Sequence, residues 1–84
     1  MTFNHRVLAH EHNGDVYFEI HEVYYNKKFK PILHTENPVS VGGESIEEIL
    51  WVLERIKSCL DKPILWAGDK FPKEYKAKKT KNKF

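Results

Sequence analysis

Five histidines in a chain of 84 residues make a metal site the first chemistry to consider. His10 and His12 stand two residues apart in the first predicted strand, so both side chains leave the same face of a sheet. His21 belongs to the second predicted strand and His34 to the third. The chain has no Cys-x-x-Cys pair and no His-Glu-x-x-His motif, which are typical spacings of zinc ligands. We therefore expect histidines on a solvent-facing sheet surface, no metal site and no cofactor.

Other side chains that carry chemistry also lack a catalytic setting. Glu19 and Glu22 point to opposite faces of one predicted strand, so they do not form a carboxylate pair. Gly42-Gly43 precedes a helix start, where backbone amides can bind an anion, but three glutamates nearby would repel phosphate. A domain of this length also has little room for an enclosed active site. We predict that the protein is not an enzyme.

The strongest structural signal is the helix start at Ser45. Ser45 and Glu48 have the spacing of a capping box, and Pro63 ends the helical pattern, which predicts a helix from about residue 46 to 60 or 61. Leu53 lies near the centre of its broad apolar arc and is expected in the core. The arc contains Ile46, Ile49, Leu50, Val52, Leu53, Ile56, Cys59 and Leu60.

Trp51 points away from this arc, beside Arg55. Two interpretations remain open: Trp51 packs inside the chain beneath the segment Ile64-Leu65-Trp66, or it is an exposed aromatic anchor for a partner. Exposed aromatic residues on the sheet could serve the same purpose. The candidate partner-binding residues are Trp51, Arg55, Tyr17, Tyr25 and Trp66.

Asn13-Gly14 between two alternating segments predicts a β-hairpin with a type I′ turn. The two-residue turn sets the register and places Ala9 opposite Phe18 on an apolar face. The opposite face carries arginine, histidine, tyrosine and glutamate and is predicted to be polar. A third strand follows at about residues 32–36, and residues 63–66 form either a fourth strand at the sheet edge or a strap over it. The fold class is thus α+β, an antiparallel β-meander of three to four strands packed on one α-helix.

Charge divides the chain into a domain, residues 1–69, and a Lys-rich tail, residues 70–84. The domain holds seven Lys or Arg against eleven Asp or Glu, whereas the tail holds seven Lys against one Glu. The tail has no consistent period and is expected to be flexible and disordered. It is a solubilising segment, a nucleic-acid contact or a dock for an acidic protein. The candidate nucleic-acid-binding residues are Lys70, Lys73, Tyr75, Lys76, Lys78, Lys79 and Lys81.

Several segments between residues 5 and 66 resemble a family of small uncharacterised bacterial and phage proteins. The segments are His21-Glu22-Val23-Tyr24-Tyr25, Lys30-Pro31, Gly43-Glu44-Ser45-Ile46-Glu47-Glu48 and Lys62-Pro63-Ile64-Leu65. The family pattern has glycine where Phe29 stands and aspartate where Glu44 stands. The resemblance implies no catalytic residues.

The order of hairpin, third strand, Gly-Glu-Ser-Ile-Glu-Glu and helix is more distantly similar to HicB-like antitoxins. Those proteins have an α+β fold and neutralise a small RNA-cleaving toxin by covering it. This chain lacks their Pro-x-x-Gly-Cys segment and has no DNA-binding helices after the domain, so the resemblance implies the architecture more than the activity.

Together these features predict a non-enzymatic protein-interaction module. We expect it to bind another protein or itself, as a homodimer or as an antitoxin-like or inhibitor-like regulator. One alternative is a nucleic-acid-binding protein that uses the basic tail, and another is a small-ligand-binding protein with its site at a dimer interface. The lone Cys59, the lack of a signal-peptide pattern and the lack of a membrane-spanning apolar run favour a cytoplasmic protein with no membrane partner.

Overall fold

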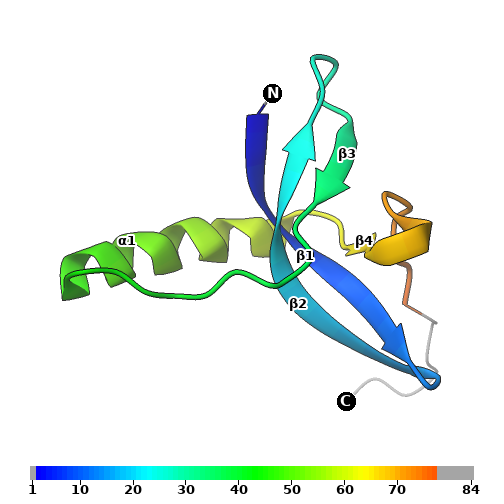
Figure 1. Cartoon of the computed structure of the whole chain (residues 1–84), viewed down its shortest axis with the longest axis horizontal. Helices are drawn as coiled ribbons and strands as arrows, with labels where there is room; N and C mark the ends of the chain where they lie inside the picture. The colour runs from blue at the N-terminus through cyan, green and yellow to red at the C-terminus, as the bar shows by residue number, and fades with distance from the viewer. Residues whose placement is uncertain (1, 78–84) are drawn as a thin grey trace.

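The computed structural model describes residues 2–77 and shows a curled four-stranded sheet with one helix (Figure 1). The strands lie in the order β3-β2-β1-β4. Their bounds are Thr2–His12 (β1), Asp15–Tyr25 (β2), Pro31–His34 (β3) and Leu65–Trp66 (β4). The helix α1 spans Ile46–Lys57 and continues directly into a 3₁₀ turn, Ser58–Asp61 (η1). A second 3₁₀ turn, Gly68–Lys70 (η2), follows β4. The predicted α+β class is confirmed.

The β1–β2 hairpin has the register that its turn predicts. Asn13 and Gly14 have φ angles of 51° and 86°, both in the left-handed region that a type I′ turn requires. Ala9 pairs with Phe18, as expected. Each strand of this hairpin is eleven residues long and curves strongly in Figure 1, so the hairpin forms most of the sheet.

The sheet is mixed, whereas the sequence predicted a purely antiparallel meander. β3 pairs antiparallel with β2, as expected. β4 is the fourth strand at the sheet edge, but it runs parallel to β1, and Leu65 is paired with Leu8. A parallel partner requires the chain to cross over between the two strands, and α1 lies within that crossover.

The core lies on the hairpin face that we predicted to be polar and solvent-exposed. Leu8, His21 and Val23 are fully buried on that face. Leu65 completes the core, and Ala67 and Phe71 pack against it. The prediction was wrong because the C-terminal segment covers this face.

Hydrogen bonds explain how polar side chains are accommodated in this core. The Arg6 guanidinium, with 9% of the residue exposed, donates to the Tyr25 hydroxyl at 2.8 Å and to the Pro63 carbonyl at 2.6 Å. These two bonds reduce the cost of burying the guanidinium, although its Nε is buried without a hydrogen-bond partner among the described residues. Arg6 therefore ties both hairpin strands to the segment that leads into β4.

Helix α1 begins where its capping residue predicts. The Glu48 amide donates to the Ser45 hydroxyl at 3.1 Å, which satisfies one of the free amides of the first turn. Gly43 lies against this turn, and a Cβ at that position would stand 2.8 Å from the Glu48 Cβ. A glycine is therefore needed for the chain to approach the helix so closely.

The helix buries one edge of the predicted apolar arc and leaves its predicted centre exposed. Ile56 in α1 and Cys59 in η1 are buried, whereas Leu53, the predicted centre of the buried face, is 46% exposed. In Figure 1 the C-terminal end of α1 lies at the sheet, and the N-terminal end extends away from it. The first turns of α1 consequently have little of the sheet to pack against.

The C-terminal segment stays attached to the domain beyond residue 70, where we expected a flexible tail to begin. The Trp66 amide donates to the Lys73 carbonyl at 2.7 Å, and the Tyr75 amide donates to the Ile64 carbonyl at 2.8 Å. The remaining tail candidates, Lys78, Lys79 and Lys81, lie outside the described residues.

Within residues 2–77, no helix has both the length and the apolar character needed to cross a bilayer.

Candidate functional site

Two of the candidate partner-binding residues, Trp51 and Arg55, lie together on the outside of α1. Trp51 is 60% exposed, so the interpretation that residues 64–66 cover it is wrong. The Arg55 guanidinium carbon stands 4.8 Å from the centre of the Trp51 ring, which is a cation–π contact. The pair lines an open cavity of about 500 Å³ between α1, the 37–40 segment and the hairpin.

The other three candidates are dispersed. Tyr25 is buried by the core, with its hydroxyl bonded to Arg6, so it cannot contact a partner directly. Tyr17 is exposed and stacks on the His10 ring, with the ring centres 5.0 Å apart. Trp66 is half-buried beneath Lys70. The structure therefore brings together only Trp51 and Arg55 from the predicted set.

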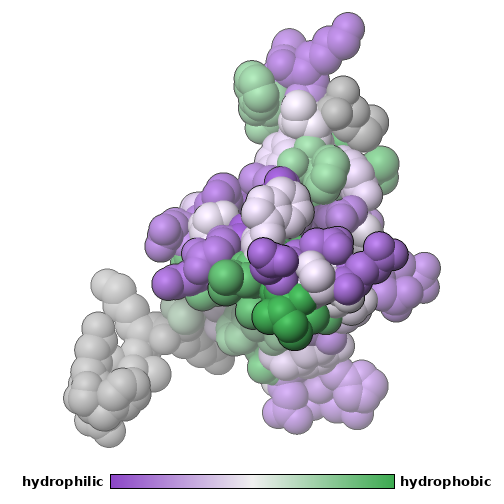
Figure 2. Space-filling view, turned by 90° about the vertical axis from the view of Figure 1, so that its left-hand side faces the viewer, coloured by the Kyte–Doolittle hydropathy of each residue, from purple (hydrophilic) through white to green (hydrophobic). Residues whose placement is uncertain are grey.

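A row of large apolar side chains runs along the exposed side of α1 and η1. We call this row the α1 stripe. Its members are spaced by three, four or seven residues, which is the repeat of a coiled-coil seam, with Lys57 at the intervening position. They are Ile46 (79% exposed), Leu50 (58%), Leu53 (46%) and Leu60 (64%). In Figure 2, which looks at the molecule from the α1 side, hydrophobic surface is exposed among hydrophilic side chains.

The α1 stripe continues into a second open cavity of about 430 Å³. This cavity lies between α1, the hairpin and the segment before the helix, and its walls are mainly apolar. Among its lining residues are Val7, Phe18, Ile20, Val41, Ile56 and Leu60. The predicted apolar face of the hairpin is thus only partly covered by α1, and Phe18 stays 49% exposed.

The described part of the Lys-rich segment makes contacts within the domain. The Lys70 ammonium lies 4.3 Å from the Trp66 ring centre and 3.9 Å from a Glu11 carboxylate oxygen. The Tyr75 ring packs edge-on against Phe18 and Trp66. Tyr75 is therefore not a free ring for stacking on a base, whereas Lys73 and Lys76 are exposed.

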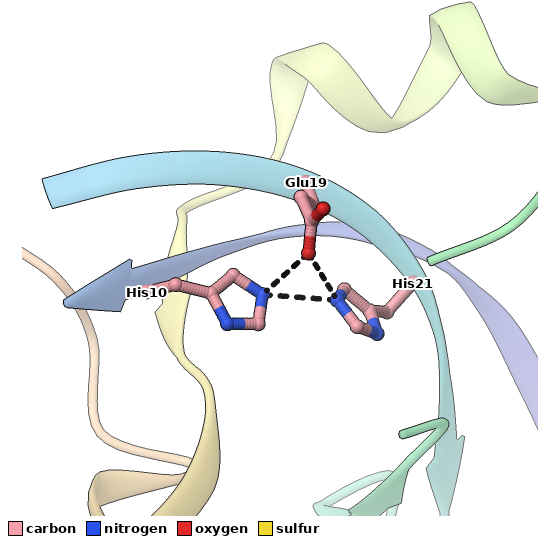
Figure 3. Close-up of side chains that lie close together, drawn as sticks. All are labelled: His10, Glu19 and His21. Carbon is pink, nitrogen blue, oxygen red and sulfur yellow. Dashed lines mark hydrogen bonds and ion pairs between the residues drawn. The ribbon is translucent and has the colours of Figure 1, made fainter. Parts of the chain in front are cut away.

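A cluster of two histidines and one glutamate lies on the same face of the hairpin as Leu8, which is the reverse of the face that carries Val7 (Figure 3). Figure 3 shows His10 from β1 and Glu19 and His21 from β2 pointing toward one another. The two Nε2 atoms are 3.0 Å apart, and the Glu19 Oε1 atom lies 3.3 Å from Nε2 of His10 and 3.7 Å from Nε2 of His21. We call these three residues the His–Glu cluster.

The tautomer of His21 follows from its hydrogen bonds. Its Nδ1 lies 2.9 Å from the Thr35 carbonyl oxygen, which can only accept, so Nδ1 carries the proton. Burial lowers the pKa of His21, and nearby His10 and His34 lower it further, although the bond to Thr35 opposes this shift. A neutral His21 protonated on Nδ1 directs the lone pair of Nε2 into the cluster.

The His–Glu cluster was missed by the sequence analysis, which expected these histidines on a solvent-facing surface. A signal was present in the hairpin register. It pairs His10 with Tyr17, Leu8 with Glu19 and Arg6 with His21, all on one face. The strand curvature and the burial of His21 then bring the three side chains together, and neither follows from residue spacing.

Comparisons with protein-family models, curated protein sequences and solved structures found no match for this chain. The likeness to HicB-like antitoxins stays a prediction. Function is therefore inferred from the geometry of the residues described above.

Proposed function

We propose that this protein is a non-enzymatic interaction module that self-associates through the α1 stripe. The observation that carries the proposal is the exposure of four large apolar residues at coiled-coil spacing on one side of α1 and η1, three of them in α1 and Leu60 in η1. Monomeric soluble proteins rarely leave so continuous an apolar surface in water, and such surfaces mark interaction sites. The stripe is distinct from the face of α1 that contacts the chain's own sheet.

A second copy of the chain fits this surface because the charges of α1 are complementary to themselves in an antiparallel pair. The first turn carries Glu47 and Glu48, and the last turn carries Arg55 and Lys57. A two-fold axis near the middle of the helix brings each acidic turn beside the basic turn of the second copy. The ion pairs set the orientation, and the apolar stripe supplies most of the affinity.

This register makes specific contacts. Leu50 of one copy lies opposite Leu53 of the other, and Ile46 lies against the aliphatic stem of Lys57. Trp51 and Arg55 lie on the side of α1 away from this seam, beside the 37–40 segment, so they take no part in the contact between the two helices.

Sedimentation equilibrium of matched variants tests this assignment. Leu50→Glu and Leu53→Glu each place a charge in the seam and are expected to weaken self-association at least tenfold. Leu33→Glu is the matched control, because Leu33 on β3 is 57% exposed, almost the same as Leu50, but lies outside α1. Its dimer dissociation constant should stay within about twofold of that of the wild type.

A dimer that survives both α1 variants, or one lost equally in the Leu33→Glu control, would contradict the assignment. A wild-type protein that stays monomeric would remove self-association. The antitoxin-like form of the proposal, in which the stripe covers a different protein, would then be the one to pursue.

A further inference from the structure

We propose that His10, Glu19 and His21 bind a divalent first-row transition-metal ion, with Zn²⁺ as the ion the ligand set fits best. This binding site is separate from the α1 stripe and does not depend on self-association. Two imidazole nitrogens and one carboxylate oxygen form a common three-residue zinc ligand set, and water completes the coordination. The absence of a thiolate sets this site apart from structural zinc sites rich in cysteine.

The spacing of the donor atoms fits one ion. Bonds of about 2.0–2.1 Å at tetrahedral angles place neighbouring ligand atoms about 3.3 Å apart. The three observed separations, 3.0, 3.3 and 3.7 Å, bracket that value. An ion could therefore contact all three atoms with side-chain shifts of a few tenths of an ångström.

The surroundings of His21 orient it as a ligand. Its Nδ1–H donates to the Thr35 carbonyl at 2.9 Å, which leaves Nε2 unprotonated and directed at the other two residues. A hydrogen bond from the second imidazole nitrogen to a carbonyl or carboxylate is the usual support of a metal-bound histidine. His21 is fully buried, so its ring is also fixed by packing.

Without an ion, the cluster has more acceptors than protons. The His21 Nε2 lone pair and the Glu19 carboxylate lie 3.7 Å apart, and both face His10 Nε2. A single proton on His10 Nε2 cannot make two well-directed hydrogen bonds at once. A cation at the centre would satisfy all three groups together.

Access and selectivity also agree with the assignment. The side chains of His10 and Glu19 are 18% and 36% exposed, so an ion can enter and keep water ligands. His34 lies near the cluster but is not a ligand, because its Nε2 accepts from the Gly68 amide at 3.1 Å and its Nδ1 donates to the Thr35 carbonyl at 2.6 Å. Imidazole and carboxylate together suit Zn²⁺, Co²⁺ and similar ions better than Mg²⁺ or Ca²⁺.

Titration of untagged, full-length, EDTA-stripped protein with Zn²⁺ and with Co²⁺ tests the site. Calorimetry should give one ion per chain for Zn²⁺, and Co²⁺ should give visible d–d absorption that Zn²⁺ displaces. Glu19→Gln and His10→Gln remove one ligand each from partly exposed positions, and His21→Asn keeps the donor to Thr35 while removing Nε2. Each variant should lose more than about 100-fold in affinity, since loss of an outer-shell partner alone costs 10- to 100-fold.

His12→Asn is the matched control, because His12 belongs to the same strand but is exposed and outside the cluster. Its Zn²⁺ affinity should match that of the wild type. Circular dichroism of each variant separates ligand loss from unfolding, and Glu19→Gln remains decisive if His21→Asn does not fold. A wild type that binds neither ion, or folded Glu19→Gln and His10→Gln proteins that bind as the wild type does, would overturn the site and leave a hydrogen-bonded histidine pair.

Discussion

At the scale of single residues, Phe29 occupies a backbone conformation that suits glycine better than phenylalanine. It has a φ of 60°, in the left-handed region, and is 77% exposed. A non-glycine residue there costs roughly 1–2 kcal/mol. The Asn26 side chain holds the loop by accepting from the Lys28 and Lys30 amides.

Phe29→Gly should therefore raise the free energy of unfolding by about 1 kcal/mol, as measured by urea denaturation. Phe29→Ala is the control, because it removes the ring but keeps a Cβ in the left-handed region. Equal stabilisation by alanine would show that the exposed ring, not the backbone, is unfavourable.

His21 makes the stability of the metal-free protein depend on pH. The pKa of His21 is lower in the folded chain than the ordinary value of about 6.5, mainly because burial disfavours the charged ring. The neighbouring His10 and His34 lower this pKa further, whereas the bond to Thr35 and the Glu19 carboxylate raise it. Below about pH 6.5 the unfolded chain consequently binds more protons than the folded chain. The free energy of unfolding therefore decreases as the pH is lowered. Thermal melts in EDTA from pH 7.5 to 5 should show this loss, and His21→Asn should reduce it. An unchanged pH dependence in His21→Asn, with His12→Asn as reference, would assign the loss to other groups.

At the scale of elements, the helix start and the hairpin could be predicted because both depend on local chemistry. Ser45 supplies the cap of α1, and Asn13-Gly14 supplies the turn and hence the register. The buried face of α1 could not be predicted in this way. Residues that pack on the chain's own sheet and residues of the α1 stripe form one continuous apolar arc, and periodicity does not separate them.

Gly43→Ala should destabilise the protein by about 1–3 kcal/mol, because its Cβ would meet the Glu48 Cβ at 2.8 Å in the first turn of α1. Gly42→Ala is the matched control, since a Cβ there has nothing within 4 Å. Chemical denaturation of both variants measures the difference. Similar stabilities would mean that the segment before α1 moves freely to accept the methyl group.

The two faces of α1 should respond differently to truncation. Ile56→Ala removes a buried side chain and should lower the free energy of unfolding by about 2–5 kcal/mol. Its melting temperature should therefore be lower than that of the wild type at every protein concentration. In the proposed dimer, association with a second copy stabilises the folded chain by mass action, so the melting temperature rises with protein concentration. Leu53→Ala weakens this association and should therefore reduce the concentration dependence. A large loss in Leu53→Ala at every concentration would restore the original prediction that Leu53 belongs to the core of one chain.

At the scale of the whole molecule, the α+β class could be predicted, but the position of the core could not. The buried face carries Arg6 and His21, which hydrogen bonds to distant backbone carbonyls make tolerable. Those carbonyls belong to Pro63 and Thr35, which meet the hairpin only after the chain has folded back. The His–Glu cluster escaped prediction for the same reason, since burial of His21 depends on segments far away in the sequence.

The molecule as a whole has a small core and a helix whose first turns extend beyond the sheet (Figure 1). A chain of 84 residues has little hydrophobic surface to spare, and four large apolar residues on α1 and η1 are exposed, which is why we propose that a second copy covers them. Self-association through the α1 stripe is the central claim. Light scattering coupled to size exclusion, on wild-type protein at tens of micromolar and above, tests it most directly. We predict the molar mass of two chains, and the mass of one chain at every concentration would contradict the claim.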